Sequence, residues 1–329
     1  MEDFKKLFDS FARLKVGVIG DVMLDTYMWG SVERISPEAP VPVVSLHKKD
    51  YRIGGAGNVA LNIQSLGASA FVLSVIGKDE DGDRLERLFA EKNIHTTYLV
   101  RSGERITTNK TRIISRNQQM MRLDAEITRD LNGVDATSLI DRVKVFIAKE
   151  RPDVIVFEDY NKGVLTEGII HEIISICKKA GILTAADPKR KNFFSYKWVD
   201  IFKPNLKEVK EGLNLLLEEV NRNTLGSIHK ELAALLHHAI SLITLSDKGI
   251  FYQKDGQAEI IASHLRNVAD VSGAGDTVIA VASLVYVVTK NVRMMAEIAN
   301  IAGGLVCEEV GTVAINKEKL LQECELLLP

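Results

Sequence analysis

Val268-Ala-Asp-Val-Ser-Gly-Ala-Gly-Asp-Thr277 joins two glycines and an acid to the start of a long apolar run. Gly273 and Gly275 permit the backbone angles that a tight turn requires. The apolar residues 278–288 predict a buried helix that begins at this turn. Because a helix N-terminus presents free backbone N–H groups, a glycine turn in front of one is a binding site for an anion such as phosphate.

Asp276 lies in the first turn of this predicted helix. A carboxylate would repel a bound phosphate, unless its task is to take a proton from the group that attacks the phosphorus. A sugar hydroxyl attacks poorly unless a base accepts its proton. We therefore predict phosphoryl transfer with Asp276 as the base. The N–H groups of Gly273, Ala274, Gly275 and Asp276 would hold the oxygens of the transferring group.

Length and composition exclude several other classes of function. A chain of 329 residues can form one large α/β domain or two ordinary ones. The net charge of −2 gives no basic surface for nucleic acid or for an anionic membrane. Three separated cysteines fit no metal site or disulfide framework, which favours a reducing cytoplasm. The longest apolar run, 278–288, is shorter than the roughly 18 residues that a membrane span needs.

Short apolar segments alternate with helical patterns through most of the chain. Strands are predicted at 15–20, 70–76, 154–157, 182–186, 201–202 and 241–246. This alternation predicts an α/β fold in which helices cover both faces of a mostly parallel sheet. Polar residues follow the strands, where such sheets bind ligands: Asp21, Asp159, Asp187, Asn205 and Ser246. With no internal repeat or linker, residues 1–329 are expected to form a single domain.

Two β-like blocks interrupt this alternation. One contains Pro37, Pro40 and Pro42, which exclude a helix, and the other spans residues 107–123. We expect strands inserted at about 30–50 and 105–123 to form a small sheet that acts as a lid. The second block carries Lys110, Arg112, Arg116 and Arg122. Alternating basic residues commonly form a solvated face, but on a lid they could also grip a substrate phosphate.

Three motifs each have a structural and a functional interpretation. The glycines of Arg52–Gly67 could allow a helix to pack closely on the sheet, or with Asn58 could form a site for sugar hydroxyls. Asn205-Leu-Lys-Glu208 has the spacing of a capping box, and the same residues could contact hydrated Mg²⁺ and ATP phosphates. Asp21 could be a helix cap or turn residue rather than a ligand.

Taken together, the motifs resemble those of the ribokinase-like (PfkB) carbohydrate kinases. The resemblance rests on Gly54-Gly-Ala-Gly-Asn58, Asn205-Leu-Lys-Glu208 and Asp270-Val-Ser-Gly-Ala-Gly-Asp276, and it covers nearly the whole chain. Further segments are similar to one branch, the D-glycero-β-D-manno-heptose-7-phosphate kinases of lipopolysaccharide-core precursor synthesis. They are Gly20–Asp25, Arg34–Val43, Thr108–Arg112, Ser115–Gln119 and Asp159–Gly163.

The resemblance implies a ribokinase-like three-layer fold and an ATP-dependent sugar kinase. Its acceptor would be the anomeric hydroxyl of the heptose 7-phosphate, and its product the 1,7-bisphosphate. Asn205 and Glu208 would order Mg²⁺–ATP, with Ser246, Gly249 and Asn300 near the nucleotide. The residues implied at the sugar are Asp21, Asp25, Gly54, Gly55, Asn58, Asp159, Lys162 and Asp187, with Lys110 and Arg112 at its phosphate.

The resemblance also implies a monovalent cation and a homodimer. Asp270 matches a K⁺ position of the family, although Val271 stands where many relatives have threonine, so that a backbone carbonyl would serve there. Lid strands of the family often pair between subunits. Two alternatives stay open: a related kinase for another sugar or sugar acid, such as 2-keto-3-deoxygluconate, and a non-catalytic sugar- or nucleotide-binding protein. The basic lid argues against the first alternative, and Asp276 with Glu208 argues against the second.

Overall fold

The central sheet of the computed structural model has eight strands in the order β14-β13-β12-β11-β10-β9-β1-β4. Residues 3–116, 118–217 and 219–328 are described. The strands are β1 (Lys15–Gly20), β4 (Ser69–Leu73), β9 (Val154–Glu158), β10 (Leu183–Asp187), β11 (Ile201–Phe202), β12 (Ile240–Thr244), β13 (Ile250–Lys254) and β14 (Gln257–Ile261). Those from β4 to β12 are parallel, while β13 and β14 are antiparallel. The predicted, mostly parallel sheet is confirmed.

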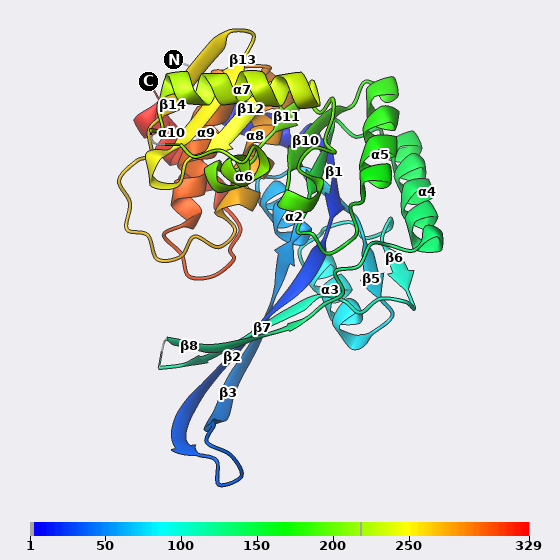
Figure 1. Cartoon of the computed structure of the whole chain (residues 1–329), viewed down its shortest axis with the longest axis vertical. Helices are drawn as coiled ribbons and strands as arrows, with labels where there is room; N and C mark the ends of the chain where they lie inside the picture. Colours follow the sequence, from blue (N-terminus) through cyan, green and yellow to red (C-terminus); the bar gives the residue numbers. More distant parts are fainter. Residues whose placement is uncertain (1–2, 117, 218, 329) are drawn as a thin grey trace.

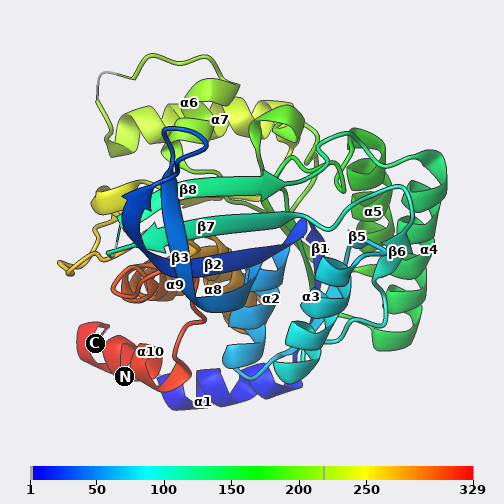
Figure 2. The same cartoon turned by 90° about the horizontal axis from the view of Figure 1, so that it is seen from below.

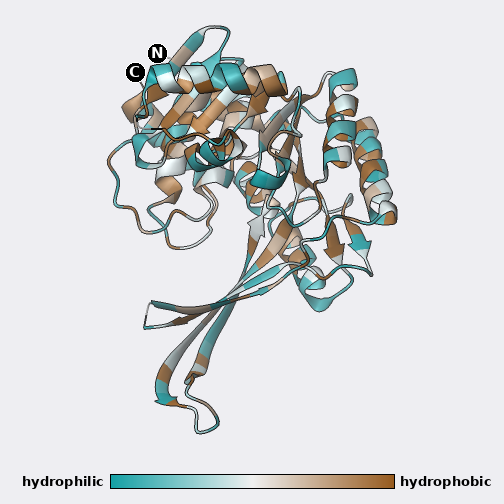
Figure 3. Ribbon diagram, viewed as in Figure 1, coloured by the Kyte–Doolittle hydropathy of each residue, from teal (hydrophilic) through white to brown (hydrophobic). Residues whose placement is uncertain are grey.

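Helices cover both faces of this sheet, which gives three layers (Figure 1). One face packs against α1 (Phe4–Ser10), α2 (Ala56–Ser65), α3 (Glu80–Glu91), α8 (Ala274–Thr289), α9 (Val292–Val306) and α10 (Lys317–Leu327). The other packs against α4 (Gly133–Glu150), α5 (Glu167–Ala180), α6 (Leu206–Gly212) and α7 (Arg222–Leu236). Along β9, Val154 and Val156 join the first core, and Ile155 and Phe157 the second. Strands buried on both faces consist mainly of apolar residues, and brown segments mark them in the hydropathy colouring (Figure 3).

A second sheet stands away from the body (Figures 1 and 2). Its strands are β2 (Val22–Ile35), β3 (Pro42–Gly55), β7 (Asn109–Ser115) and β8 (Gln118–Ala125), in the order β3-β2-β7-β8. We call it the lid sheet. The predicted small sheet is therefore present, but β2 begins at Val22 rather than near residue 30. Its first half is buried against the body, so it lacks the alternating pattern of a solvated strand. Asn117, within the second predicted block, lies outside the described residues.

The chain departs from the predicted elements at a few further places. The predicted strand 70–76 is divided into β4 and β5 (Val75–Gly77), which pairs with β6 (Val100–Ser102). Ser74 separates them, and its hydroxyl donates to the Gly20 carbonyl at 2.6 Å. Helix α7 begins at Arg222 and ends before His237, which has a left-handed backbone conformation. Short 3₁₀ turns complete the fold: η1 (Phe11–Arg13), η2 (Arg190–Asn192) and η3 (Ser246–Lys248).

Helix α8 is deeply buried beside the predicted site. Every residue from Asp276 to Tyr286 is buried, and the helix contacts α2, α9, β9 and β10. The helix predicted from the apolar run is thus confirmed, with its first residue at Ala274. Within the described parts of the chain, no helix has both the length and the apolar character to cross a membrane.

Candidate active site

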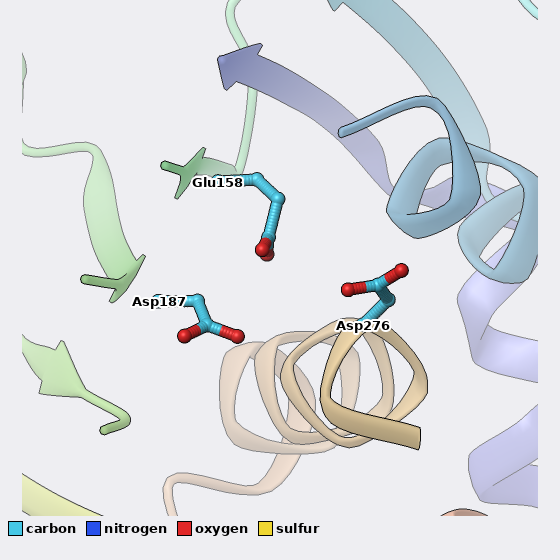
Figure 4. Close-up of side chains that lie close together, drawn as sticks. All are labelled: Glu158, Asp187 and Asp276. Atoms are coloured by element: carbon cyan, nitrogen blue, oxygen red, sulfur yellow. The ribbon is translucent and has the colours of Figure 1, made fainter. Parts of the chain in front are cut away.

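The carboxyl ends of neighbouring strands bring acids together at one edge of the central sheet. Glu158 ends β9 and Asp187 ends β10, and the two residues are partners in the parallel register. Asp276 faces them from the first turn of α8 (Figure 4). One oxygen from each of the three carboxylates lies within 4.8 Å of the other two. Carboxylates this close together can share protons or hold a divalent cation.

The turn before α8 has the geometry that its glycines predict. Gly273 is the N-cap residue with φ +81°, a left-handed conformation that favours glycine. A Cβ atom at this position would lie only 2.7 Å from Asn58 Nδ2. Glycine therefore lets the turn approach α2 closely and directs the first N–H groups of α8 toward the strand ends.

Asp276 is held by two hydrogen bonds, one on each carboxylate oxygen. Asn58 Nδ2 donates to Oδ2, and the Tyr160 hydroxyl donates to Oδ1, both at 2.8 Å. Burial raises the pKa of Asp276 to about 6, although the hydrogen bonds from Asn58 and Tyr160 oppose that shift. A carboxylate with this pKa is ionised at neutral pH and still accepts a proton readily, which suits a general base. Tyr160 has no counterpart among the predicted site residues.

Two lysines, also unpredicted, neutralise the acid at the end of β10. Lys203 Nζ lies 2.8 Å from Asp187 Oδ2, and Lys189 Nζ lies 3.0 Å from Oδ1. Burial alone would raise the pKa of Asp187, but Lys189 and Lys203 lower it below its ordinary value. Lys203 directly follows the short strand β11. It therefore belongs to the same pattern of polar residues after strands, once lysines are counted among them.

Glu158, the fourth unpredicted residue, has an unusual environment for a carboxyl group. It is 0% exposed, and neither of its carboxylate oxygens has a hydrogen-bond partner among the described residues. Burial, together with the nearby Asp187 and Asp276, raises the pKa of Glu158 well above its ordinary value. Glu158 is the last residue of a buried strand and directly precedes Asp159. This position in the sequence is the signal that could have identified it as a site residue.

Asp21, predicted to bind the sugar, holds a neighbouring loop in this structure. Its carboxylate accepts hydrogen bonds from the backbone N–H groups of Tyr160, Lys162 and Val164, at 2.9, 3.0 and 3.1 Å. Burial raises its pKa to about 6. The ammonium group of Lys162 pairs with Glu126 at 2.7 Å. Contact of Asp21 or Lys162 with a sugar stays a prediction.

Asp159 has a similar, fully buried arrangement. It accepts hydrogen bonds from the Asn161 backbone, from Asn192 Nδ2 and from the Tyr196 hydroxyl, at 2.8 to 2.9 Å. Burial raises the pKa of Asp159. Protein donors therefore occupy its oxygens, and its predicted role at the sugar stays a prediction.

The predicted lid residues lie at the base of the lid sheet. Asp25 pairs with Arg112 at 2.6 Å, and both side chains are largely buried. The ammonium group of Lys110 lies 5.5 Å from the centre of the Tyr160 ring, so the lid sheet contacts the loop beside the base. The predicted contact of Lys110 with the substrate stays a prediction.

Gly54 and Gly55 connect the lid sheet to α2, and the structure supports the packing interpretation of the glycine motif, while its contact with a sugar stays a prediction. A Cβ on Gly54 would collide with the Asp25 carboxylate, and one on Gly55 with the Asp21 carbonyl. Gly55 also has φ +60° as the N-cap residue of α2. These glycines serve close packing, while Asn58 of α2 reaches the base.

Asn205 and Glu208 form the predicted capping box of α6. The Glu208 N–H donates to Asn205 Oδ1, and the Asn205 N–H donates to Glu208 Oε2, both at 2.8 Å. The structural interpretation is confirmed. The other oxygen of Glu208 lies 2.8 Å from Lys189 Nζ, so this carboxylate also faces the acid cluster. Its predicted contact with Mg²⁺–ATP remains a prediction.

The residues predicted near the nucleotide lie at the same edge of the sheet, beside β12 to β14. Ser246 is the first residue of the turn η3, which follows β12, and Gly249 comes directly after this turn. Asn300 of α9 donates from Nδ2 to the Ala262 carbonyl, directly after β14, at 2.8 Å. The residues predicted to bind the sugar gather instead at β1, β9 and β10, and α8, which carries Asp276, packs against β9 and β10.

Asp270 connects two loops next to the glycine turn. It accepts hydrogen bonds from the backbone N–H groups of Ser272 and Gly311, each at 2.9 Å. Its neighbour Val271 is exposed. The K⁺ site predicted here stays a prediction.

Comparison with known proteins agrees with this geometry. Residues 13–319 match the family model described as pfkB family carbohydrate kinase. The chain belongs to the pfkB carbohydrate kinases. It is 38% identical over 310 residues to the bifunctional protein HldE of Syntrophotalea carbinolica, and 36% identical over 308 residues to that of Helicobacter pylori. These alignments cover 93% of this chain but 62% and 65% of the relatives, so the chain spans less than two thirds of their length.

Solved structures of two other kinases share the fold of this pfkB kinase. Escherichia coli phosphofructokinase-2 in complex with potassium has a TM-score of 0.78 and 18% identity, covering 95% of this chain and 99% of its own. Arabidopsis thaliana ribokinase complexed with ribose and ATP has a TM-score of 0.70 and 17% identity, covering 94% and 98%. The predicted ribokinase-like fold is thereby confirmed, and family membership makes the protein an ATP-dependent sugar kinase.

Glu158 gives a first testable prediction for this kinase. The pKa of Glu158 in the folded protein is raised above the ordinary value of 4.5. The stability that this group contributes is therefore fully present below pH 4.5, and it is lost as the pH rises toward the pKa of the folded state. Glu158→Gln removes this titration. We therefore compare the free energy of unfolding of this variant with that of the unmodified protein at each pH. The difference, variant minus unmodified, should increase by about 1 kcal/mol or more from about pH 5 to about pH 8. Denaturant unfolding at both pH values measures the change. Exposed Glu91→Gln is the control, and a difference independent of pH would refute the assignment.

Proposed function

We propose that this kinase transfers the γ-phosphoryl group of ATP to the anomeric hydroxyl of D-glycero-D-manno-heptose 7-phosphate, forming the 1,7-bisphosphate for lipopolysaccharide-core precursors. Two observations support the substrate. The chain is similar to HldE over nearly all of its length, and branch-like segments lie in the lid sheet and in the loop after β9. The observation that carries the chemistry is Asp276, buried at a helix N-terminus with both oxygens oriented by hydrogen-bond donors.

In the proposed reaction, Asp276 accepts the proton of the anomeric hydroxyl. The oxygen of that hydroxyl forms a bond to the γ-phosphorus while the bond from this phosphorus to the ADP oxygen breaks. The first N–H groups of α8 hold the oxygens of the transferring phosphoryl group. Lys189 and Lys203 add positive charge at the same strand ends, where negative charge is concentrated.

The carboxylates around these lysines fit a hydrated Mg²⁺, because carboxylate oxygens and water are its preferred ligands. Glu208 would hold the ion through water, as its oxygen that pairs with Lys189 faces the acid cluster, and the unpartnered oxygens of Glu158 provide further acceptors. Bound there, Mg²⁺ would supply positive charge that neutralises the ATP phosphates. Asp270 is the proposed K⁺ position; the related E. coli phosphofructokinase-2 was solved in complex with potassium.

A cytoplasmic homodimer formed through the lid sheet completes the proposal. The outer strands β3 and β8 each have one edge that no other strand of this sheet pairs with in the described chain. Met120, Met121 and Leu123 of β8 are about half exposed. An exposed strand edge with apolar side chains is a template for pairing with another chain. Sedimentation of a variant with Met121→Lys and Leu123→Lys would test the dimer.

The lid residues test the substrate assignment. Lys110→Ala should raise KM for heptose 7-phosphate at least about 10-fold, since a charged hydrogen bond to the phosphate is lost, while KM for ATP changes little. Adding Arg112→Ala should raise it further, although Arg112 also neutralises buried Asp25. Steady-state ADP release measures both constants.

Lys48→Ala with Lys49→Ala is the matched control, because it removes two charges from the same sheet, farther along β3 from the body. It should leave KM for the sugar phosphate within about twofold. An equal rise of KM for ATP and for the sugar phosphate in the Lys110 variant would remove the proposed phosphate contact.

A further inference from the structure

We propose that Tyr160 is a positioning residue for the base: its hydroxyl fixes the carboxylate of Asp276 in the orientation that faces the acceptor hydroxyl. The proposal rests on the proposed function in one respect only, that Asp276 is the base. Tyr160 contacts no reacting atom in this arrangement and acts through Asp276.

The contact between the two side chains is well defined. The Tyr160 hydroxyl lies 2.8 Å from Asp276 Oδ1, and Asn58 Nδ2 lies 2.8 Å from Oδ2. With one donor on each oxygen, the carboxylate cannot rotate about its Cβ–Cγ bond without losing a hydrogen bond. Each oxygen still has a free lone pair, so the acceptor hydroxyl can bind without displacing Tyr160.

The backbone of Tyr160 is fixed by a second buried acid. Asp21, just after β1, accepts the N–H groups of Tyr160, Lys162 and Val164 and so holds the whole loop 160–164. Arg105 supports the same loop through a hydrogen bond to the Lys162 carbonyl. Asp21 thus acts on the base indirectly, by placing the tyrosine.

The ring of Tyr160 lies between two ammonium groups. Lys110 of the lid sheet is 5.5 Å from the ring centre, and Lys189, after β10, is 5.6 Å from it. Cations over an aromatic face are favourable, so both contacts hold the ring in place. Through Lys110, the position of the lid sheet is connected to the orientation of the base.

The hydrogen bond has a defined electrostatic consequence. Burial and the nearby acids raise the pKa of the Tyr160 phenol well above its ordinary value, so the group remains a donor. Its bond favours the ionised form of Asp276 and lowers the pKa of that acid. The other titratable groups that face Asp276 are Glu158, Asp187, Lys189 and Lys203. All four remain when Tyr160 is replaced by phenylalanine, so only one hydrogen bond is removed.

The test is the pH profile of kcat/KM for the full chain. The unmodified protein should lose activity below about pH 6, the pKa of Asp276. In Tyr160→Phe this acid limb should move to higher pH by about one unit, the scale of a lost hydrogen bond to a charged group. Tyr196→Phe is the matched control, because the Tyr196 hydroxyl also donates to a carboxylate inside the protein, but to that of Asp159. It should lower thermal stability similarly and leave the limb in place. Superimposable profiles for Tyr160→Phe and the unmodified protein would overturn the proposal.

A second measurement separates this proposal from the proposed function. The ¹³C carboxyl resonance of Asp276, assigned with Asp276→Asn, reports its pKa in the free protein without any substrate. If no sugar phosphate is turned over, the proposed function fails. If Tyr160 orients Asp276, the resonance still titrates at higher pH in Tyr160→Phe than in the unmodified protein, whether or not the enzyme is active. An unchanged titration would reject the contact even in an active kinase.

A substitution that keeps the hydroxyl covers the case in which Tyr160→Phe does not fold. In 3-fluorotyrosine the hydroxyl is more acidic and therefore a stronger donor. Placed at position 160, it should move both the Asp276 titration and the acid limb to lower pH. Movement to higher pH, or none, would contradict the proposed contact.

Discussion

Replacing Asp276 with asparagine is expected to lower kcat by at least about 100-fold, the scale of a lost general base. Asparagine keeps the shape of the side chain and can keep the bond from Tyr160, but it cannot accept the proton of the acceptor hydroxyl. ATP binding, which we propose to depend on the turn at Gly273 and on the residues beside β12, should change by less than about threefold. Single-turnover kinetics and nucleotide titration measure the two effects.

Loss of charge at this position is not expected to destabilise the fold. The pKa of Asp276 is raised to about 6, so its charge destabilises the fold above that pH, and the neutral asparagine removes this cost. Asp200→Asn is the matched control: Asp200 accepts two hydrogen bonds from Thr184 but lies before β11, at the opposite edge of the sheet. It should keep normal turnover. Near-normal kcat in Asp276→Asn would remove the assignment of the base.

Replacing Lys203 with methionine should lower the free energy of unfolding by about 3–5 kcal/mol, the cost of leaving a buried charge without its partner. Lys203 is 2% exposed, and Asp187 beside it is 3% exposed. After the substitution, only Lys189 would balance Asp187, while Glu158 and Asp276 would repel it. Chemical denaturation at neutral pH measures the loss.

Lys144→Met provides the contrast, because Lys144 pairs with Glu172 at 2.9 Å on the solvent-exposed surface. Exposed pairs contribute little, so its denaturation midpoint should remain unchanged. If Lys203→Met and Lys144→Met had equal midpoints, the buried lysine would not be the group that balances the acid cluster.

The chemistry of the site was predictable where it depends on short-range patterns. The glycine turn, the apolar helix behind it and the acid in its first turn lie within about 20 residues, and α8 forms as those residues indicate. Asp187 was found because strand ends gather at one edge of a parallel sheet. The capping box of Asn205 and Glu208 has a local spacing, and the structure contains both of its hydrogen bonds.

Residues whose roles depend on loop paths were not predictable in the same way. Tyr160 reaches Asp276 across 116 positions of the chain, and nothing in its neighbours indicates the direction of its ring. Asp21 was recognised as a strand-end acid, but its partners are backbone N–H groups of the loop 160–164, which no side-chain pattern marks. The start of β2 was missed because burial against the body removes the alternation of a solvated strand.

The central claim is that Asp276 activates the anomeric hydroxyl of a sugar that already bears a phosphate. The most direct measurement incubates the protein with ATP, Mg²⁺ and a panel that contains heptose 7-phosphate, fructose 6-phosphate, ribose and 2-keto-3-deoxygluconate. ADP release and ³¹P NMR of the products follow the reaction. We predict ADP release with heptose 7-phosphate above all others, and a new phosphorus signal coupled to the anomeric proton. Preferred turnover of an unphosphorylated sugar, or phosphorylation at any carbon other than the anomeric one, would contradict it.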